Sequence, residues 1–353
     1  MTRRTATASS TWWFIRLGSL SLRVPRRALP ASAVLLLLIL LTVIISVGQG
    51  EYYIAPLDVV RATLGLETGN PDHPLVVRTF RLPRIVLAAL VGAALALSGA
   101  VLQGITRNPL ADPGVLGINQ GAGLAAVTLL TLAPAASGAL LPWVALGGGL
   151  LAALLIYLLA WNRGASPTRL LLVGIGLGAV ATALTTFLIV FGDVREVQRA
   201  LVWLTGSVYG RTWEHVRVLG LWMLVLVPLV LLGARSLNIL SLGDAPAKAL
   251  GQRVEFARGL LIIVAVALAT GAVAVAGTVA FAGLMAPHAA RRLVGGAFEA
   301  LLPVSALFGA LLLLVADLAG RTVIAPSQLP VGLVTAVIGA PYLLYLLWRQ
   351  RSA

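Results

Sequence analysis

Long runs of apolar residues without a single charged side chain constrain this 353-residue chain more than any other feature. One of them follows Arg84, extends for about twenty residues and reaches the next charged residue at Arg107. A run of this length matches the α-helix that crosses the hydrocarbon core of a bilayer. Several such runs, with 59% hydrophobic and only 11% charged residues, predict an all-α polytopic membrane protein.

Arginine-bearing segments separate the apolar runs and divide the chain into ten expected transmembrane helices. We place them at about 31–48, 85–106, 115–133, 143–160, 170–191, 215–233, 259–276, 279–290, 303–320 and 331–348. The first run is not a cleavable signal, because Gln49 and Glu51 stand where small residues would be needed. We expect residues 1–30 to form a cytoplasmic or interfacial segment, with 12–27 along the inner membrane surface, and 31–353 to form one ten-helix domain.

Basic residues are unevenly distributed between the two sides of this topology. With the N-terminus in the cytoplasm, cytoplasmic segments carry 17 Lys and Arg against 4 Asp and Glu, and external segments carry 9 against 8. This asymmetry follows the positive-inside rule and places both termini in the cytoplasm. It also accounts for the net charge of +14 without a nucleic-acid partner, because the basic residues lie between apolar runs and not in one patch.

Small residues recur along two of the expected helices at a spacing that brings them onto one face. They are Gly92, Ala96, Ala100 and Gly104 in one helix, and Gly174 and Gly178 in another. Such faces predict close helix packing. The segments GAALALSGAVLQG and GAVAVAGTVAFAG, which start at Gly92 and Gly271, align without a gap. Because five spans separate them, they favour two five-helix halves related as an inverted repeat, although a composition rich in Ala, Leu and Gly can produce the same pattern.

Several mechanisms are disfavoured by what the spans lack. An ion-coupled transporter needs ionisable groups in its spans, and the one acidic residue well inside an apolar run, Asp317, is better explained by a local ion pair with Arg321. The sequence contains no phosphate-binding loop of the G-x-x-x-x-G-K-[ST] type and no cysteine. His73, His215 and His288 are too scattered for a zinc-protease motif, so we expect no catalytic residue and no metal site.

The insert at 234–258 is the longest expected cytoplasmic connection. Within it, Asp244 is placed to cap a short helix whose first turn accepts Pro246 and which ends at Gly251. A short exposed helix between two spans can transmit force from a soluble partner, and the alternative is a simple interfacial connector.

Six sequence blocks occur in the order found in one known family. They are RLPR, SGAVLQG with RNPLADPGVLG, LSLGDAPAKALG, FAGLMAPHAARRLVG, ADLAGR and LPVGLVTAVIGAP. From about Leu57 to Trp348 the chain resembles the FecCD/BtuC family, the permease subunits of ABC importers for iron-siderophore, haem and cobalamin. The resemblance implies a second permease subunit, identical or different, two cytoplasmic ATPases that bind ATP and Mg²⁺, and an extracytoplasmic substrate-binding protein. It implies no cofactor on this chain itself.

The resemblance also implies roles for particular residues. Docking of the binding protein would fall on Arg81, Arg84 and Arg321, for which headgroup snorkelling is the alternative. The inner gate would fall on Asn108, Leu110, Pro167 and Thr168, although some relatives carry a hydroxyl residue at the position of Pro167. Coupling to the ATPase would fall on Leu242, Gly243, Asp244, Ala245, Pro246, Ala247, Lys248, Ala249 and Leu250.

The resemblance leaves the cargo open. The motifs RNPLADP and WLTGS-x-x-GRTW resemble siderophore systems and favour a ferric siderophore as the cargo. The resemblance implies that the cargo crosses the cytoplasmic membrane through a pore of apolar and small side chains. Haem or cobalamin is the alternative cargo, and a membrane scaffold without transport activity is the alternative of another class.

Overall fold

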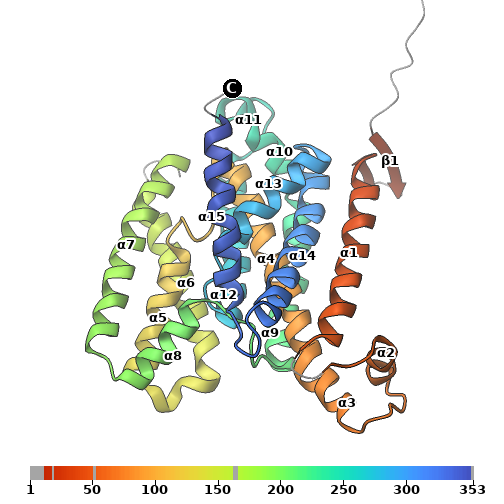
Figure 1. Cartoon of the computed structure of the whole chain (residues 1–353). Coiled ribbons are helices and arrows are strands. Elements are labelled where there is room, and N and C mark those ends of the chain that lie inside the picture. The colour runs from red at the N-terminus through yellow and green to blue at the C-terminus, as the bar shows by residue number, and fades with distance from the viewer. Residues whose placement is uncertain (1–11, 18–19, 51–52, 162–165, 351–353) are drawn as a thin grey trace, which may run out of the picture.

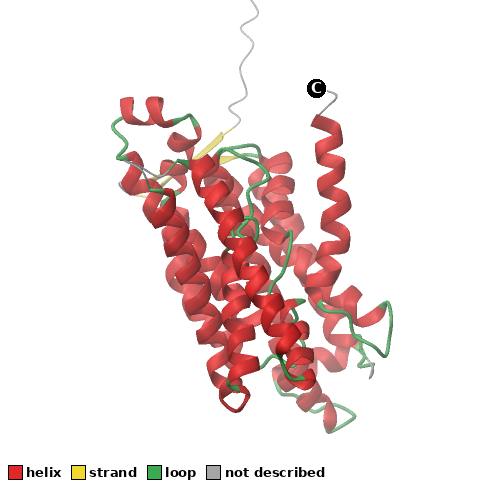
Figure 2. Cartoon of the chain, turned by 90° about the vertical axis from the view of Figure 1, so that its left-hand side faces the viewer, coloured by secondary structure: helices red, strands yellow, loops and turns green. Residues whose placement is uncertain are grey.

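Helices that run between two opposite ends of the molecule make up most of the described chain (Figures 1 and 2). The computed structural model describes residues 12–17, 20–50, 53–161 and 166–350. The long helices are α1 (Ala28–Gly48), α4 (Leu82–Thr106), α6 (Ser137–Ala160), α7 (Pro167–Phe191), α9 (Trp213–Leu232), α12 (Val254–Ala276), α14 (Phe298–Thr322) and α15 (Val331–Gln350). Among the described residues, eight helices are long and apolar enough to cross a membrane, and each coincides with, includes or lies within one of these.

Two shorter helices, α5 (Ile118–Leu132) and α13 (Ala282–Val294), take the places of the third and eighth expected spans. Their 15 and 13 residues are too few to cross a core of roughly 30 Å at about 1.5 Å per residue. Non-helical segments, 107–117 and 277–281, precede them and are partly buried in the protein, where irregular backbone is tolerated. The all-α polytopic prediction is confirmed. Helix α5 is shorter than the expected span 115–133, whereas α13 is about as long as the expected span 279–290 and begins at Ala282.

The two ends of the bundle carry different segments (Figure 1). One end, here called the α11 end, holds β1 (Trp12–Leu17), α10 (Ala234–Ser241), α11 (Asp244–Ala249) and the last residues of α15. The opposite α8 end holds α2 (Pro56–Leu64), α3 (Asp72–Leu75) and α8 (Val194–Leu204). This grouping agrees with the predicted topology, in which the N-terminal segment, the 234–258 insert and the C-terminal residues share one side.

A β-hairpin precedes the first long helix. Its strands β1 and β2 (Leu20–Pro25) pair antiparallel, with Trp12 opposite Pro25. The sequence analysis expected a segment along the membrane surface and did not identify strands. Aromatic and β-branched residues favour extended structure, and both strands contain them.

At the α8 end, the short helix α2 follows the first long helix. Pro56 opens it, and Gly65 closes it with a positive φ of 84°. Beyond α2, α3 leads through the π-helical turn η1 (Val76–Arg81) directly into α4, so that one helical stretch of 35 residues extends from Asp72 to Thr106.

The small-residue face of α4 forms a close helix contact, as predicted. Gly92 and Ala96 lie against Gly309 of α14, and a methyl group at Gly92 would collide with the Gly309 backbone. Gly104, further along the same face, receives the ring of Phe298. Because α4 is among the most buried of the long helices, these contacts help to define the centre of the bundle.

Gly174 and Gly178 in α7 also form a close contact, as predicted. Their partner is a loop and not another helix. Leu116 and Gly117, at the end of the segment 107–117, pack against these two glycines. Gly117 has a φ of 80°, which a residue with a side chain rarely adopts. The loop therefore enters the bundle about two turns from the start of α7.

The two segments of the internal sequence match differ in structure. Residues 92–104 lie wholly within α4, whereas the segment from Gly271 leaves α12 after Ala276 and enters α13 only at Ala282. Helices α4 and α12 are nevertheless the second helices of their respective five-helix halves. The inverted repeat stays a prediction.

Candidate functional site

A cavity of about 820 Å³ lies between α5, α7, α15 and the two non-helical segments that precede α5 and α13. Apolar side chains such as Leu171, Ile175 and Leu343 form much of its wall, in agreement with the expected apolar pore. Among the described residues that line it, none is basic and Asp112 is the sole acid. The cavity wall is therefore largely apolar and carries little charge.

A strip of polar side chains crosses this apolar wall and was not predicted from the sequence. On α7, the hydroxyls of Thr182, Thr185 and Thr186 donate to carbonyls of their own helix at 2.8–3.0 Å, which leaves their oxygen lone pairs facing outward as acceptors. On α5, the side-chain oxygens of Asn119 and Gln120 are buried without a hydrogen-bond partner among the described residues. Single Thr, Asn and Gln residues in apolar runs carry no sequence signal for this arrangement.

Two of the four predicted gate residues line the cavity. Asn108 and Leu110 lie in its wall, and the Asn108 side chain accepts a hydrogen bond from the Leu110 N–H at 2.9 Å. Pro167 and Thr168 form the first turn of α7 and are not among the residues that line the cavity. The gate role of all four residues stays a prediction.

Asp112 lies in the same loop, outside the membrane-spanning helices, and is buried. Its Oδ1 accepts a hydrogen bond from the Gly114 N–H at 2.8 Å, and the carboxylate packs against Gly283 at the start of α13. Burial raises the pKa of Asp112 to about 6, although the hydrogen bond from Gly114 acts in the opposite direction. The described residues include no cluster of three or more His, Cys, Asp or Glu side chains suited to a metal ion.

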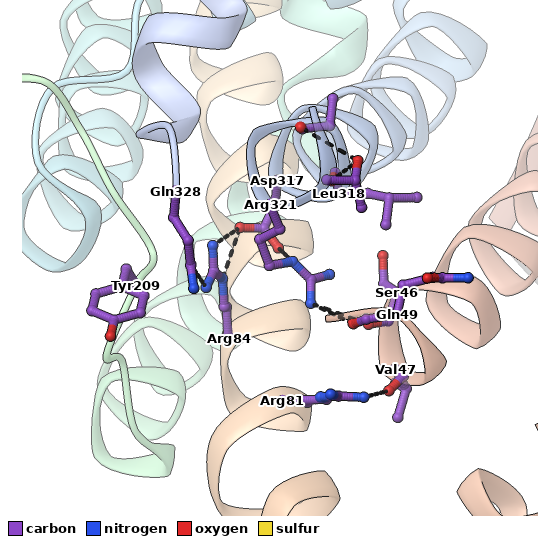
Figure 3. Close-up of polar contacts among 12 residues, drawn as sticks. Ser46, Val47, Gln49, Arg81, Arg84, Tyr209, Asp317, Leu318, Arg321 and Gln328 are labelled. Carbon is purple, nitrogen blue, oxygen red and sulfur yellow. Dashed lines mark hydrogen bonds and ion pairs between the residues drawn. The ribbon is translucent and has the colours of Figure 1, made fainter. Parts of the chain in front are cut away.

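The structure brings the three predicted docking arginines near one another, and two of them contact the carboxylate of Asp317 (Figure 3). Asp317 contacts Arg321 at 3.2 Å, which confirms the predicted local ion pair, and Arg84 from α4 at 2.8 Å. Sequence reasoning missed the second contact because Arg84 lies 233 residues away along the chain.

These arginines are also tied to neighbouring backbone and side chains. Arg81 donates to the Val47 carbonyl at 2.5 Å and Arg321 to the Ser46 carbonyl at 3.2 Å, both at the end of α1 where helix carbonyls lack intrahelical partners (Figure 3). Arg84 donates to the Gln328 side chain at 2.6 Å. Each arginine is at most 9% exposed, which is unlike a side chain that snorkels to lipid headgroups. Their docking role stays a prediction.

At the α11 end, the predicted coupling insert forms two short helices, α10 and α11. Leu242 and Leu250, which flank α11, are 61% and 63% exposed. The short helix was predicted correctly, but the capping role of Asp244 was wrong. Gly243, with a φ of 111°, occupies the N-cap position, and no side chain caps the helix.

Asp244 instead links the insert to two membrane helices. Its Oδ1 accepts a hydrogen bond from Arg258 Nη2 of α12 at 2.6 Å and lies 3.7 Å from Arg107 Nη2, at the end of α4. The hydrogen bond from Arg258 lowers the pKa of the Asp244 carboxyl. The capping prediction failed because the Asp244 carboxylate pairs with two arginines and not with the N–H groups at the start of α11.

A multi-pass helical bundle with a largely apolar cavity and a short exposed helical insert at one end is the architecture of a membrane permease. The FecCD transport family model matches residues 35–349, and the chain belongs to this family. The predicted family is thereby confirmed.

Individual relatives cover nearly the whole chain. The Fe(3+)-citrate import system permease protein YfmE of Bacillus subtilis is 46% identical over 92% of this chain and 96% of its own length. The achromobactin transport system permease protein CbrC of Dickeya dadantii is 45% identical over 95% and 96%. A solved structure of an inward-facing metal-chelate type ABC transporter is 31% identical, with a TM-score of 0.82 over 91% of this chain and 99% of the other.

Proposed function

We propose that this chain is the permease subunit of an ABC importer that carries a ferric siderophore or a related ferric chelate across the cytoplasmic membrane. The observation that carries the proposal is the family match over residues 35–349, together with relatives whose names specify ferric citrate and achromobactin. The cavity of about 820 Å³ has the size and the largely apolar wall that a bulky chelate needs for passage.

The energy for transport comes from partner ATPases at the α11 end, which is the cytoplasmic side in this proposal. The residues 242–250 supply the contact, because Leu242 and Leu250 present exposed apolar side chains on either side of α11. Binding of ATP by the partners moves this insert, and the chain itself hydrolyses nothing.

The salt bridges of Asp244 give that movement a path to the cavity. Asp244 contacts Arg107, and the next residues along the chain are the gate candidates Asn108 and Leu110. A shift of α11 is thereby passed both to α12, through Arg258, and to the loop that lines the cavity. Pro167 and Thr168, at the start of α7, complete the gate in this proposal.

The α8 end faces the extracytoplasmic binding protein. Arg81, Arg84 and Arg321 serve docking by fixing the shape of this surface. They also give it a positive potential, because Asp317 pairs with only two of the three. Their burial makes direct pairing with the partner's carboxylates a smaller contribution than the family resemblance suggests. A second permease subunit, whose identity is open, and two ATPases complete the assembly.

Uptake by cells tests the proposal and separates the cargo classes. A strain lacking the gene is supplied with radiolabelled ferric siderophore, ferric citrate, haem or cobalamin, with and without the wild-type gene. We expect uptake of a ferric chelate to be lost and then restored. If the gene restores only haem or cobalamin uptake, that compound and not a ferric chelate is the cargo. Unchanged uptake of all four compounds in the strain lacking the gene would favour a scaffold.

The coupling contact has its own test. The residues 242–250 are replaced with a Gly/Ser linker of equal length, and copurification of the ATPase is measured. We expect the ATPase to be lost from the variant. As a control, the external helix α2 is replaced in the same way, which should leave the ATPase bound.

A further inference from the structure

A second hollow lies at the α8 end, and we call it the outer arginine groove. It measures about 580 Å³ and lies between α8, the end of α5, the start of α6 and the loop that follows α8. The residues that matter here are Arg195, Gln198, Arg199, Trp203, Tyr209 and Arg211. Arg195, Gln198 and Arg199 lie on one face of α8, because residues three and four apart share a helix face.

The charge of this groove is positive and only partly compensated. Its described lining contains three arginines and no acidic side chain. Glu196 lies 3.2 Å from Arg199, whereas Asp193 accepts a hydrogen bond from the backbone N–H of Arg195 and caps α8. Within the described residues, the guanidinium groups of Arg195 and Arg211 therefore have no carboxylate partner.

Buried donors without acceptors add to this imbalance. Trp203 is 6% exposed, and its Nε1–H has no acceptor among the described residues. The Nε–H of Arg211 is likewise buried without one, and burial lowers the pKa of this guanidinium. A buried donor without an acceptor costs about 1–3 kcal/mol, so native structures rarely keep several in one place without a use for them.

We propose that the outer arginine groove binds the free carboxylates of the cargo before it enters the central cavity. This inference rests on the proposed function and narrows the cargo to ferric chelates that carry free carboxylate groups. Guanidinium groups pair with carboxylates through two parallel hydrogen bonds, and Leu130 and Val202 supply apolar contact for the rest of the ligand.

The position of the groove fits a step that precedes entry. Leu204, the residue after Trp203 on α8, lines the central cavity. The helix α8 thus separates the groove from the cavity. An anionic chelate held by Arg195 and Arg211 is concentrated beside the wall of the cavity, and the positive potential of the groove also raises the rate of encounter.

Direct binding provides the first test. The complex of the permease with its partner subunits is placed in phosphatidylcholine nanodiscs and titrated with citrate by calorimetry. We expect the double variant Arg195→Gln, Arg211→Gln to bind citrate at least tenfold more weakly. The matched control Arg61→Gln removes an exposed arginine of α2 that lies outside the groove, and it should bind citrate like the wild type. Equal affinity in the double variant and the wild type overturns the inference.

A single variant keeps the test valid if the double variant fails to fold. Arg195 is exposed, so Arg195→Gln disturbs little packing and should still weaken citrate binding severalfold. Nanodiscs that contain phosphatidylglycerol give the competing source of an oxyanion. If anionic lipid displaces citrate at the groove, the groove is a headgroup site and the inference is wrong.

Transport kinetics distinguish this inference from the proposed function. The double variant should raise KM for ferric citrate and leave KM for a neutral ferric trihydroxamate unchanged. An equal rise for both chelates would indicate docking of the binding protein and would overturn the cargo site. Failure of the wild type to transport either chelate would count against the proposed function itself.

Discussion

At the residue scale, the arginines at the α8 end show how a charged cluster is kept inside an apolar bundle. Asp317 is 2% exposed and contacts both Arg84 and Arg321, so one carboxylate serves two guanidinium groups (Figure 3). The carbonyls of Ser46 and Val47 take up further donors of Arg321 and Arg81. The cluster joins α1, α4 and α14, which lie far apart in the sequence.

Removal of this carboxylate should destabilise the bundle strongly. Asp317→Asn leaves two buried cations without a counter-charge, and breaking such a buried pair costs about 3–5 kcal/mol. Thermal unfolding in detergent measures the effect. The control Asp58→Asn breaks an exposed pair with Arg61 at 3.7 Å and should cost less than about 1 kcal/mol. Equal melting temperatures for the two variants would contradict the structural role of Asp317.

Asp112 gives a prediction about pH. Burial raises its pKa in the folded protein to about 6, above the ordinary aspartate value of 3.8, so the folded state favours the protonated carboxyl. The charged form therefore destabilises the fold above pH 6, and this penalty disappears as the pH falls towards 4. Asp112→Asn should be more stable than the wild type at pH 8, by up to about 3 kcal/mol, and similar to it at pH 4. A stability difference that is the same at both pH values would contradict the shift.

At the element scale, close approach of helices at glycines holds the centre of the bundle together. In α4, Gly92 meets the backbone of Gly309, and Gly99 meets that of Gly283. The contacts place α4 against both α14 and α13. Because lipid is as apolar as the side chains, packing of this kind supplies much of the association between membrane helices.

Gly92→Ala should separate α4 from α14 and lower stability by about 1–3 kcal/mol, as overpacking does in a dense core. The control is Gly147→Ala in α6, where no atom lies within 4 Å of the added methyl group. That variant should keep or slightly raise the melting temperature, because Ala favours a helix over Gly. A neutral Gly92→Ala variant would show that the contact with Gly309 is dispensable.

Hydropathy predicted the long helices, because each apolar run carries its own signal. The starts of α5 at Ile118 and of α13 at Ala282 could not be predicted in this way, since the buried loops before them depend on partners such as Gly174 and Gly283. The family resemblance gave the coupling segment and two residues of the cavity wall, Asn108 and Leu110. The polar strip and the second partner of Asp317 arise from tertiary contacts between distant segments.

At the scale of the whole molecule, the groove, the cavity and the insert lie along one route from the α8 end to the α11 end. The link between the insert and the cavity is the pair of contacts that Asp244 makes with Arg107 and Arg258. In the proposed mechanism, these contacts pass a movement of the insert to the predicted gate.

Loss of these contacts should uncouple ATP hydrolysis from transport while the subunits stay assembled. In the complex, Arg107→Gln removes one partner of Asp244, and we expect ATP hydrolysis to persist while chelate uptake falls severalfold. The matched control Arg253→Gln changes a nearby cytoplasmic arginine outside this contact and should leave uptake intact. The Arg258 hydrogen bond lowers the pKa of Asp244, so the carboxylate stays charged and uptake should not depend on its titration between pH 5 and 8. Normal uptake by Arg107→Gln would exclude this path.

The central claim is that the chain is a passive passage driven by partner ATPases. It is tested most directly by reconstituting the chain into liposomes, alone and with its partner permease, ATPases and binding protein, and measuring labelled ferric chelate inside. We predict accumulation with the full assembly and ATP only, and none with the chain alone under a proton or sodium gradient. Uphill uptake by the chain alone on such a gradient would contradict the account.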